Sequence, residues 1–169
     1  MTQNKFKIDT VQIGSVLQCM SPDAFARIKG DYTHEMLQGY VLFYEIQGMV
    51  LVVADIHGLP EKTGKCNRGI HAMHIHSGSS CTGNAEDSFA NAKGHYSIND
   101  CAHPWHSGDM PPLFSDNGNA WSSFVTSEFA VSDIIGKTVI VHEGIDDFTG
   151  QPAGNSGRKI GCGVIYKNA

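Results

Sequence analysis

Short runs of apolar and β-branched residues alternate with polar turn residues along most of the chain, a pattern typical of β-strands. Gly48 separates two of these runs, which predicts a hairpin. Helical periodicity is confined to short segments around 86–91 and 131–135. Regular short strands with turn signals predict an all-β antiparallel sandwich or barrel. The predicted strands are 24–30, 39–47, 49–56, 68–76, 121–131, 136–142 and 159–166.

The sequence predicts one domain, because its 169 residues contain no interior linker and no internal repeat. We expect an N-terminal extension over 1–20 and a single domain over 21–169. A loop from about residue 77 to 120 is an exception to the strand pattern. Structureless loops longer than about 15 residues are usually functional or disordered. This loop is rich in His, Trp and Tyr over 94–112, so we expect a metal ion to order it.

Composition narrows the function classes. An apolar content of 41% and a charged content of 17% are typical of a soluble globular protein, and no apolar run is long enough for a membrane span. The net charge of −5, without a basic run, argues against nucleic-acid binding, and an anionic substrate would need a local positive patch. The N-terminal stretch lacks the apolar segment of a signal peptide. We therefore expect a cytoplasmic protein, or an exported one whose leader was removed.

Five cysteines are present and none forms a CxxC motif, which argues against a zinc finger or a thioredoxin-like site. One pair could form a disulfide, and at least one thiol then has no partner within the chain. The plainer interpretation of each cysteine is a small buried apolar residue.

The stretch "GIHAMHIHSG" (69–78) contains three histidines. On a β-strand, His74 and His76 share one face and His71 lies on the other. Neighbouring imidazoles are poor core residues but good ligands for a transition metal. A single HxH motif is more typical of a polar strand with surface histidines, so the interpretation depends on the remaining histidines.

Six of the nine histidines and one aspartate provide two donor sets. Three nitrogens and one oxygen suit a tetrahedral zinc site at His95, His103, His106 and Asp109. Four imidazoles suit copper at His74, His76, His142 and His95. His95 belongs to both sets because a deprotonated imidazole can bridge two cations. His34 and His57 are predicted to be ordinary surface or turn residues.

With these motifs the chain resembles the copper/zinc superoxide dismutases, and the "HSGDMPP" form resembles their bacterial branch. The matching stretches span about residues 24–166 and include "IKGD", "GLP", "HAMHIH", "HSGDMPP", "GKTVIVHEGIDD" and "GNSGRKIGCGVI". The resemblance implies an eight-stranded Greek-key β-barrel or sandwich with two long functional loops.

The resemblance also implies the chemistry. It implies copper and zinc on the two donor sets, and conversion of superoxide to oxygen and hydrogen peroxide by copper redox cycling, with zinc in a structural role. His95 would leave copper on reduction, take up a proton and supply it to the peroxide. Asp146 would accept hydrogen bonds from one copper ligand and one zinc ligand, and His71 would pack behind the copper site. A disulfide would join Cys81 to Cys162.

The chain departs from the family at the cation that guides superoxide. The family has an arginine where the alignment on Cys162 places Lys159. Arg158 lies one residue earlier, and strand alternation should turn it away. Lys159 is therefore the expected guide, with Arg158 as the alternative if the loop is shifted by one residue.

A second departure is the close spacing of His103 and His106 in "HPWH". Zinc remains the expected ion, but His103 could instead be a loop residue beside a weak or empty site, and Cys101 could be a rival ligand. No role is assigned to Cys19, Cys66 or Cys101. The main alternative to an enzyme is a copper-binding or copper-buffering protein on the same barrel. The oligomeric state stays open, with a homodimer as one option.

Overall fold

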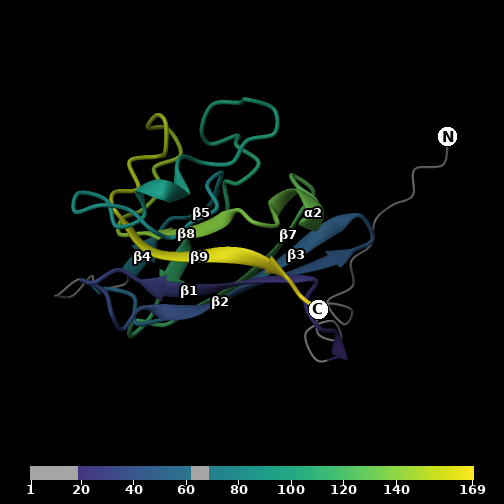
Figure 1. Ribbon diagram of the computed structural model, residues 1–169, viewed down its shortest axis with the longest axis horizontal. Helices are drawn as coiled ribbons and strands as arrows, with labels where there is room; N and C mark the ends of the chain where they lie inside the picture. Colours follow the sequence, from purple (N-terminus) through teal and green to yellow (C-terminus); the bar gives the residue numbers. More distant parts are fainter. Residues whose placement is uncertain (1–18, 62–68) are drawn as a thin grey trace.

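The computed structural model describes residues 19–61 and 69–169, and this part of the chain is nearly all β (Figure 1). Every strand pair is antiparallel. The main sheet curls into a half-barrel with the strand order β5-β8-β9-β1-β2-β3-β7, and β4 and β6 form a separate pair. The strands are β1 (Ala24–Gly30), β2 (Gln38–Ile46), β3 (Met49–His57), β4 (Gly69–His71), β5 (Met73–His76), β6 (Leu113–Ser115), β7 (Ala120–Thr126), β8 (Thr138–His142) and β9 (Lys159–Lys167).

The predicted all-β class is confirmed, as is the hairpin around Gly48. In the register of β2 and β3, Ile46 pairs with Met49. Gln47 and Gly48 form the turn with φ values of 51° and 79°. A two-residue turn with both φ angles positive matches the right-handed twist of the flanking strands. A glycine at the second position adopts this conformation without steric cost.

Two predictions about the middle of the chain were wrong. The run 68–76 is not one strand: Ala72 separates β4, which pairs with β6, from β5, which pairs with β8. The Ala72 backbone is instead bonded to the end of β8 and to the turn after it, accepting from the His142 amide at 2.9 Å and donating to the Gly144 carbonyl at 2.8 Å. The loop expected over 77–120 contains β6, whose three residues are too short to show a period. These two differences give nine strands in the described residues.

Helical structure in the described residues is short. It comprises the 3₁₀ turn η1 (Ala90–Ala92) and the helix α2 (Val131–Ile134), close to the two predicted segments. No helix in this part of the chain has the length and apolarity that crossing a membrane requires.

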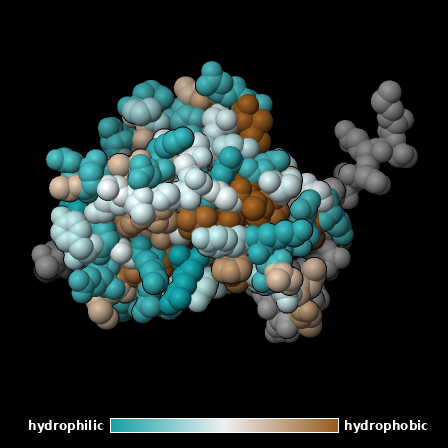
Figure 2. All heavy atoms as spheres, in the orientation of Figure 1, coloured by the Kyte–Doolittle hydropathy of each residue, from teal (hydrophilic) through white to brown (hydrophobic). Residues whose placement is uncertain are grey.

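The main hydrophobic core lies against one face of the curled sheet. Alternate residues of the strands, such as Ile28, Phe43, Val52 and Ile75, are fully or almost fully buried in one cluster. On the face shown in Figure 2, hydrophobic residues gather over the region of β9 and α2, and hydrophilic residues dominate the loops beyond the sheet. These loops carry most of the predicted donor residues, so the sheet is the fixed platform against which they are held.

Candidate metal centre

The four predicted copper ligands come together beside the paired strands β5 and β8. His74 and His76 are on β5, and His142 is the last residue of β8. His95 joins them from the long loop through an antiparallel bridge to His76. One potential ligand atom from each of the four side chains lies within 4.8 Å of the others. The strand register therefore brings together residues that lie up to 68 positions apart in the sequence.

The four predicted zinc ligands form a second group that shares His95 with the first. Asp109 is at the centre of this group. Its Oδ1 is 2.7 Å from His95 Nδ1, and its Oδ2 is 3.0 Å from His103 Nδ1 and 3.2 Å from His106 Nδ1. Asp109 is held close to the first group by an antiparallel bridge to His74. The close spacing of His103 and His106 thus allows both rings to reach the same carboxylate.

Unpaired polar atoms show that the two groups fit metal ions. Four buried ring nitrogens make no hydrogen bond among the described residues, namely His74 Nδ1, His95 Nε2, His103 Nδ1 and His106 Nδ1. The last two lie close to Asp109 Oδ2, but they are not aligned for a hydrogen bond to it. A buried polar atom without a partner is costly, and a metal ion would satisfy it. The all-imidazole group suits copper, and the group with a carboxylate oxygen suits zinc. His95 offers Nδ1 toward the second group and its unpartnered Nε2 for the first.

Hydrogen bonds hold the remaining ring nitrogens of several donors. His76 Nδ1 donates to the Lys93 carbonyl at 2.8 Å, and His142 Nδ1 donates to the Gly157 carbonyl at 3.3 Å. These bonds leave Nε2 of His76 and of His142 available, and the two atoms are 3.4 Å apart. Such partners fix both the tautomer and the orientation of a ligating ring.

Asp146 connects the two groups. This buried carboxylate accepts a bond from His74 Nε2 at Oδ2 and one from His103 Nε2 at Oδ1, both at 2.9 Å. Its Oδ1 also accepts the amide of Phe148 at 2.7 Å. One side chain therefore sets the orientation of a ring in each group.

His71 lies outside both groups. Its buried ring is 3.1 Å from two backbone carbonyl oxygens, with Nδ1 facing His142 and Nε2 facing Pro60. Of the three histidines in the "HAMHIH" stretch, His74 and His76 are therefore potential metal ligands, and His71 contacts the backbone carbonyls of His142 and Pro60.

Burial keeps three of the donor imidazoles, those of His74, His76 and His142, neutral in the metal-free protein. Burial, with neighbouring histidines, lowers the pKa of His74 to about 2 and the pKa of His76 well below its ordinary value. Burial also lowers the pKa of His142 to about 4. Burial would raise the pKa of Asp109, but its hydrogen bond to His95 and nearby histidines outweigh this effect and lower the pKa to about 2. Neutral imidazoles and an ionised carboxylate are the protonation states that bind metals.

A cavity of about 690 Å³ opens onto both groups, and His76, His95, His106 and His142 line it. Three cationic residues, Lys93, Arg158 and Lys159, also line this cavity. Strand alternation does not apply to Arg158, because β9 begins at Lys159. Arg158 and Lys159 therefore both lie at the cavity that contains the shared histidine.

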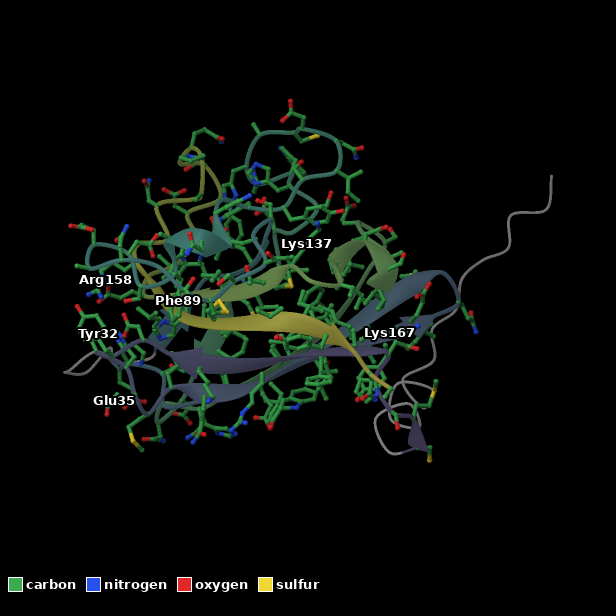
Figure 3. All side chains as sticks on the ribbon, viewed as in Figure 1. Tyr32, Glu35, Phe89, Lys137, Arg158 and Lys167 are labelled. Carbon is green, nitrogen blue, oxygen red and sulfur yellow. A yellow bond between two sulfur atoms is a disulfide. The ribbon has the colours of Figure 1, made fainter. Side chains whose placement is uncertain are left out.

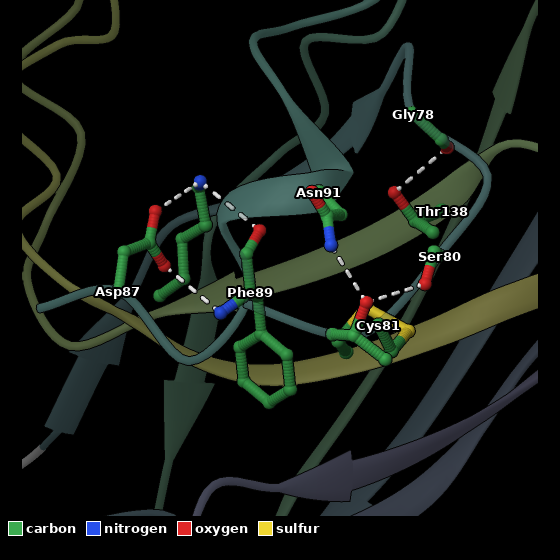
Figure 4. Close-up of a disulfide and its surroundings, with 10 residues drawn as sticks. Gly78, Ser80, Cys81, Asp87, Phe89, Asn91 and Thr138 are labelled. Atoms are coloured by element: carbon green, nitrogen blue, oxygen red, sulfur yellow. Dashed lines mark hydrogen bonds and ion pairs between the residues drawn. A yellow bond between two sulfur atoms is a disulfide. The ribbon is translucent and has the colours of Figure 1, made fainter. Parts of the chain in front are cut away.

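The two neighbouring cations have different partners. Lys159 Nζ is 2.7 Å from Asp87 Oδ2 and 3.3 Å from the Phe89 carbonyl, as the dashed lines of Figure 4 show. Arg158 Nη2 is 3.3 Å from Asp31 Oδ2. Neither aspartate could be recognised as a partner from the sequence alone, although Asp31 lies within the "IKGD" stretch.

The predicted disulfide is confirmed. Cys81 in the long loop is bonded to Cys162 in β9, with a Cα–Cα distance of 5.6 Å (Figure 4). The bond packs against a buried cluster of Phe89, Ala92 and Ile140. The long loop is therefore fastened covalently to the sheet.

The other described cysteines and histidines belong to neither group. Cys19 and Cys101 are exposed free thiols, and Cys66 lies outside the described residues. His34 contacts Asp31 at 2.8 Å, and the half-exposed His57 contacts Asn119 at 2.8 Å.

Comparison with known proteins gives consistent matches. Residues 37–165 match the family model for copper/zinc superoxide dismutase. The chain is 30% identical to superoxide dismutase [Cu-Zn] 2 of Aquifex aeolicus, over 94% of this chain and 98% of that protein. It is 28% identical to the superoxide dismutase [Cu-Zn] of Legionella pneumophila over the same shares of the two chains. It is 32% identical to that of Photobacterium leiognathi, over 57% of this chain and 64% of that protein.

Proposed function

Because the chain belongs to the copper/zinc superoxide dismutase family of oxidoreductases, we propose that it converts two superoxide anions and two protons to oxygen and hydrogen peroxide. The observation that carries the proposal is His95, whose two ring nitrogens face two different donor groups. A single imidazole shared between two donor groups distinguishes this arrangement from surface histidines and from a site for one structural metal ion.

The two donor groups would hold different metals. Copper would be held by His74, His76, His95 and His142, and zinc by His95, His103, His106 and Asp109. When bound, copper supplies one-electron redox chemistry and zinc supplies a fixed positive charge in a structural role. The protein supplies the ligand geometry, the cavity and the protonation of the product.

The chain's own residues perform the remaining tasks. Asp146 orients His74 and His103 at the same time, which fixes the position of the two donor groups relative to each other. His95 Nε2, which has no hydrogen-bond partner among the described residues, takes up a proton and donates it to the product peroxide. The cations at the cavity attract the anionic substrate against the net charge of −5.

The experiment measures metal content and superoxide consumption on the same sample. Protein loaded with copper and zinc is expected to contain one equivalent of each ion by mass spectrometry and to consume superoxide catalytically in stopped-flow measurements. Replacement His142→Ala should abolish both copper retention and activity. His57→Ala is the matched control, because this half-exposed histidine lies outside both groups, and it should change neither.

A copper-binding or copper-buffering protein gives a different result. Such a protein would retain copper through the same four histidines but would not consume superoxide catalytically. Stoichiometric copper without turnover would therefore overturn the enzymatic proposal while leaving the ligand assignment in place. Full copper retention in His142→Ala would overturn the ligand assignment itself.

A further inference from the structure

Two adjacent cations at the cavity differ in how many of their donors are free. The side chain of Lys159 is only 16% exposed, and its ammonium contacts both Asp87 and the Phe89 carbonyl. An ammonium has three donors, so two of the three are already used. The side chain of Arg158 is 55% exposed, and its guanidinium has one hydrogen-bond partner among the described residues, Asp31. A guanidinium has five N–H donors, so most of those of Arg158 remain free.

Asp31 is a rigid partner for Arg158. Its side chain is fully buried, and its Oδ1 lies at hydrogen-bond distance from the Thr33 amide (2.9 Å), the Thr33 hydroxyl (2.8 Å) and His34 Nδ1 (2.8 Å). The other oxygen, Oδ2, is the one that faces Arg158. The Asp31 amide donates to the Ile160 carbonyl at 3.0 Å, which ties the end of β1 to β9. Burial would raise the pKa of Asp31, but the bonds from His34 and Thr33 outweigh it and lower the pKa, so the carboxylate is charged at neutral pH.

The position of Arg158 places its free donors at the cavity. Arg158 and Tyr32 both line it, and Figure 3 shows the two labelled side chains at the same end of the molecule. The same cavity is lined by His95 and His142. An anion that enters toward these histidines therefore meets a planar guanidinium that can bind two oxygens at once, whereas Lys159 offers one remaining donor.

We propose that Asp31 is a positioning residue, which holds Arg158 at the cavity so that its free donors contact the anionic substrate. The ion pair between Asp87 and Lys159 has a different role. It fastens the long loop, which contains Cys81, to β9, so the charge of Lys159 is engaged and does not face the substrate freely. This inference rests on the proposed function, because it names the residues that meet superoxide. It goes further by assigning the contact with the substrate to Arg158, and by assigning the orientation of Arg158 to Asp31, a residue that belongs to neither metal group.

A double-mutant cycle tests the proposal, using Asp31→Asn, Arg158→Ala and the combination in the copper- and zinc-loaded protein. Arg158→Ala is expected to lower the second-order rate constant for superoxide about fivefold or more at low ionic strength and to flatten its salt dependence. In the Asp31→Asn background the same replacement should lower it less than about twofold. Loss of a negative charge would by itself raise the rate constant, so the dependence of one replacement on the other is the decisive quantity. An equal effect of Arg158→Ala in both backgrounds would overturn the proposal.

A second measurement does not depend on dismutation. Inorganic phosphate serves as a redox-inert anionic probe, and its dissociation constant is measured by titration calorimetry on the same four proteins. Arg158→Ala should weaken phosphate binding severalfold in the otherwise unchanged protein and little in the Asp31→Asn background. If phosphate responds in this way but no protein consumes superoxide, the proposed function fails and the Asp31–Arg158 assignment stands. If superoxide is consumed but phosphate binding responds to neither replacement, the assignment fails.

Arg158→Lys keeps the test decisive if Asp31→Asn does not fold. Lysine keeps the charge at the cavity but lacks the planar fork that can bind Asp31 and an anion together. We expect Arg158→Lys to lower the rate constant nearly as much as Arg158→Ala does. Full activity of Arg158→Lys would mean that charge alone is sufficient, and the positioning role of Asp31 would be refuted.

Discussion

The disulfide between Cys81 and Cys162 makes a stability contribution that can be calculated from the fold. The two residues are 81 positions apart, so the bond closes a long loop in the unfolded chain. In the chain-entropy model, closing a loop of this length stabilises the folded state by about 4.5 kcal/mol. Replacement of both residues by alanine should remove this contribution. Removal of the two sulfur atoms should destabilise the folded state further through poorer packing, because Cys162 is almost fully buried.

Urea unfolding of the metal-free protein measures this effect without the contribution of bound ions. For a urea m-value of about 2–3 kcal/mol/M, the double replacement should move the midpoint down by about 1.5–2 M. Cys101→Ala is the matched control, because Cys101 is an exposed free thiol, and its midpoint should change little. Circular dichroism reports the sheet, and tryptophan fluorescence should show the same transition.

Two results would refute this reasoning. A midpoint shift below about 0.3 M would mean that the loop is already ordered in the unfolded ensemble or that the bond strains the folded state. An equal loss of stability in Cys101→Ala would mean that removal of a thiol, rather than of the cross-link, causes the effect. In either case the fastening of the long loop would depend on its non-covalent interactions.

Three other replacements or conditions have distinct expected outcomes. Asp146→Asn should weaken metal binding by about 10–100-fold in chelator competition, whereas the exposed Asp147→Asn should not; equal affinities would contradict the bridging role of Asp146. In the metal-free protein, burial lowers the pKa values of His74 and His142 to about 2 and about 4, so the unfolded chain binds more protons than the folded one below a pH of about 6.5. The free energy of unfolding should then fall as pH is lowered from about 6.5, by up to about 1.4 kcal/mol per pH unit for each of these histidines. Urea midpoints that do not change with pH would contradict this effect of the two buried histidines. Lys159→Ala should speed amide hydrogen exchange in residues 81–92 and leave the salt dependence of the rate constant nearly unchanged; flattening as strong as in Arg158→Ala would return the guiding role to Lys159.

The predictable part of the fold is the part that local sequence determines. The hairpin of β2 and β3 follows from two apolar runs and a Gln-Gly turn, all within one short continuous segment. The grouping of the donor residues was predictable because histidine is rare and its chemistry is specific, so nine histidines carry more information than nine leucines would. The break at Ala72 was not predictable, because it depends on hydrogen bonds to His142 and Gly144, which are distant in the sequence. The same limit applies to the contact of Arg158 with Asp31, which are 127 positions apart and have no shared local pattern.

The long loop shows why these distant contacts matter for function. Between β5 and β6 the described chain has only the 3₁₀ turn η1 as regular helix or strand, yet His95, His103, His106 and Asp109 all lie there. Backbone hydrogen bonds within the segment and bridges to β5 hold part of it, and side-chain contacts to distant residues hold the rest. Three such contacts are the disulfide to Cys162, the hydrogen bond that His103 donates to Asp146, and the ion pair between Lys159 and Asp87. A replacement that breaks one of them should therefore lower metal affinity before it unfolds the sheet, because the strands keep their own pairing when the loop loosens.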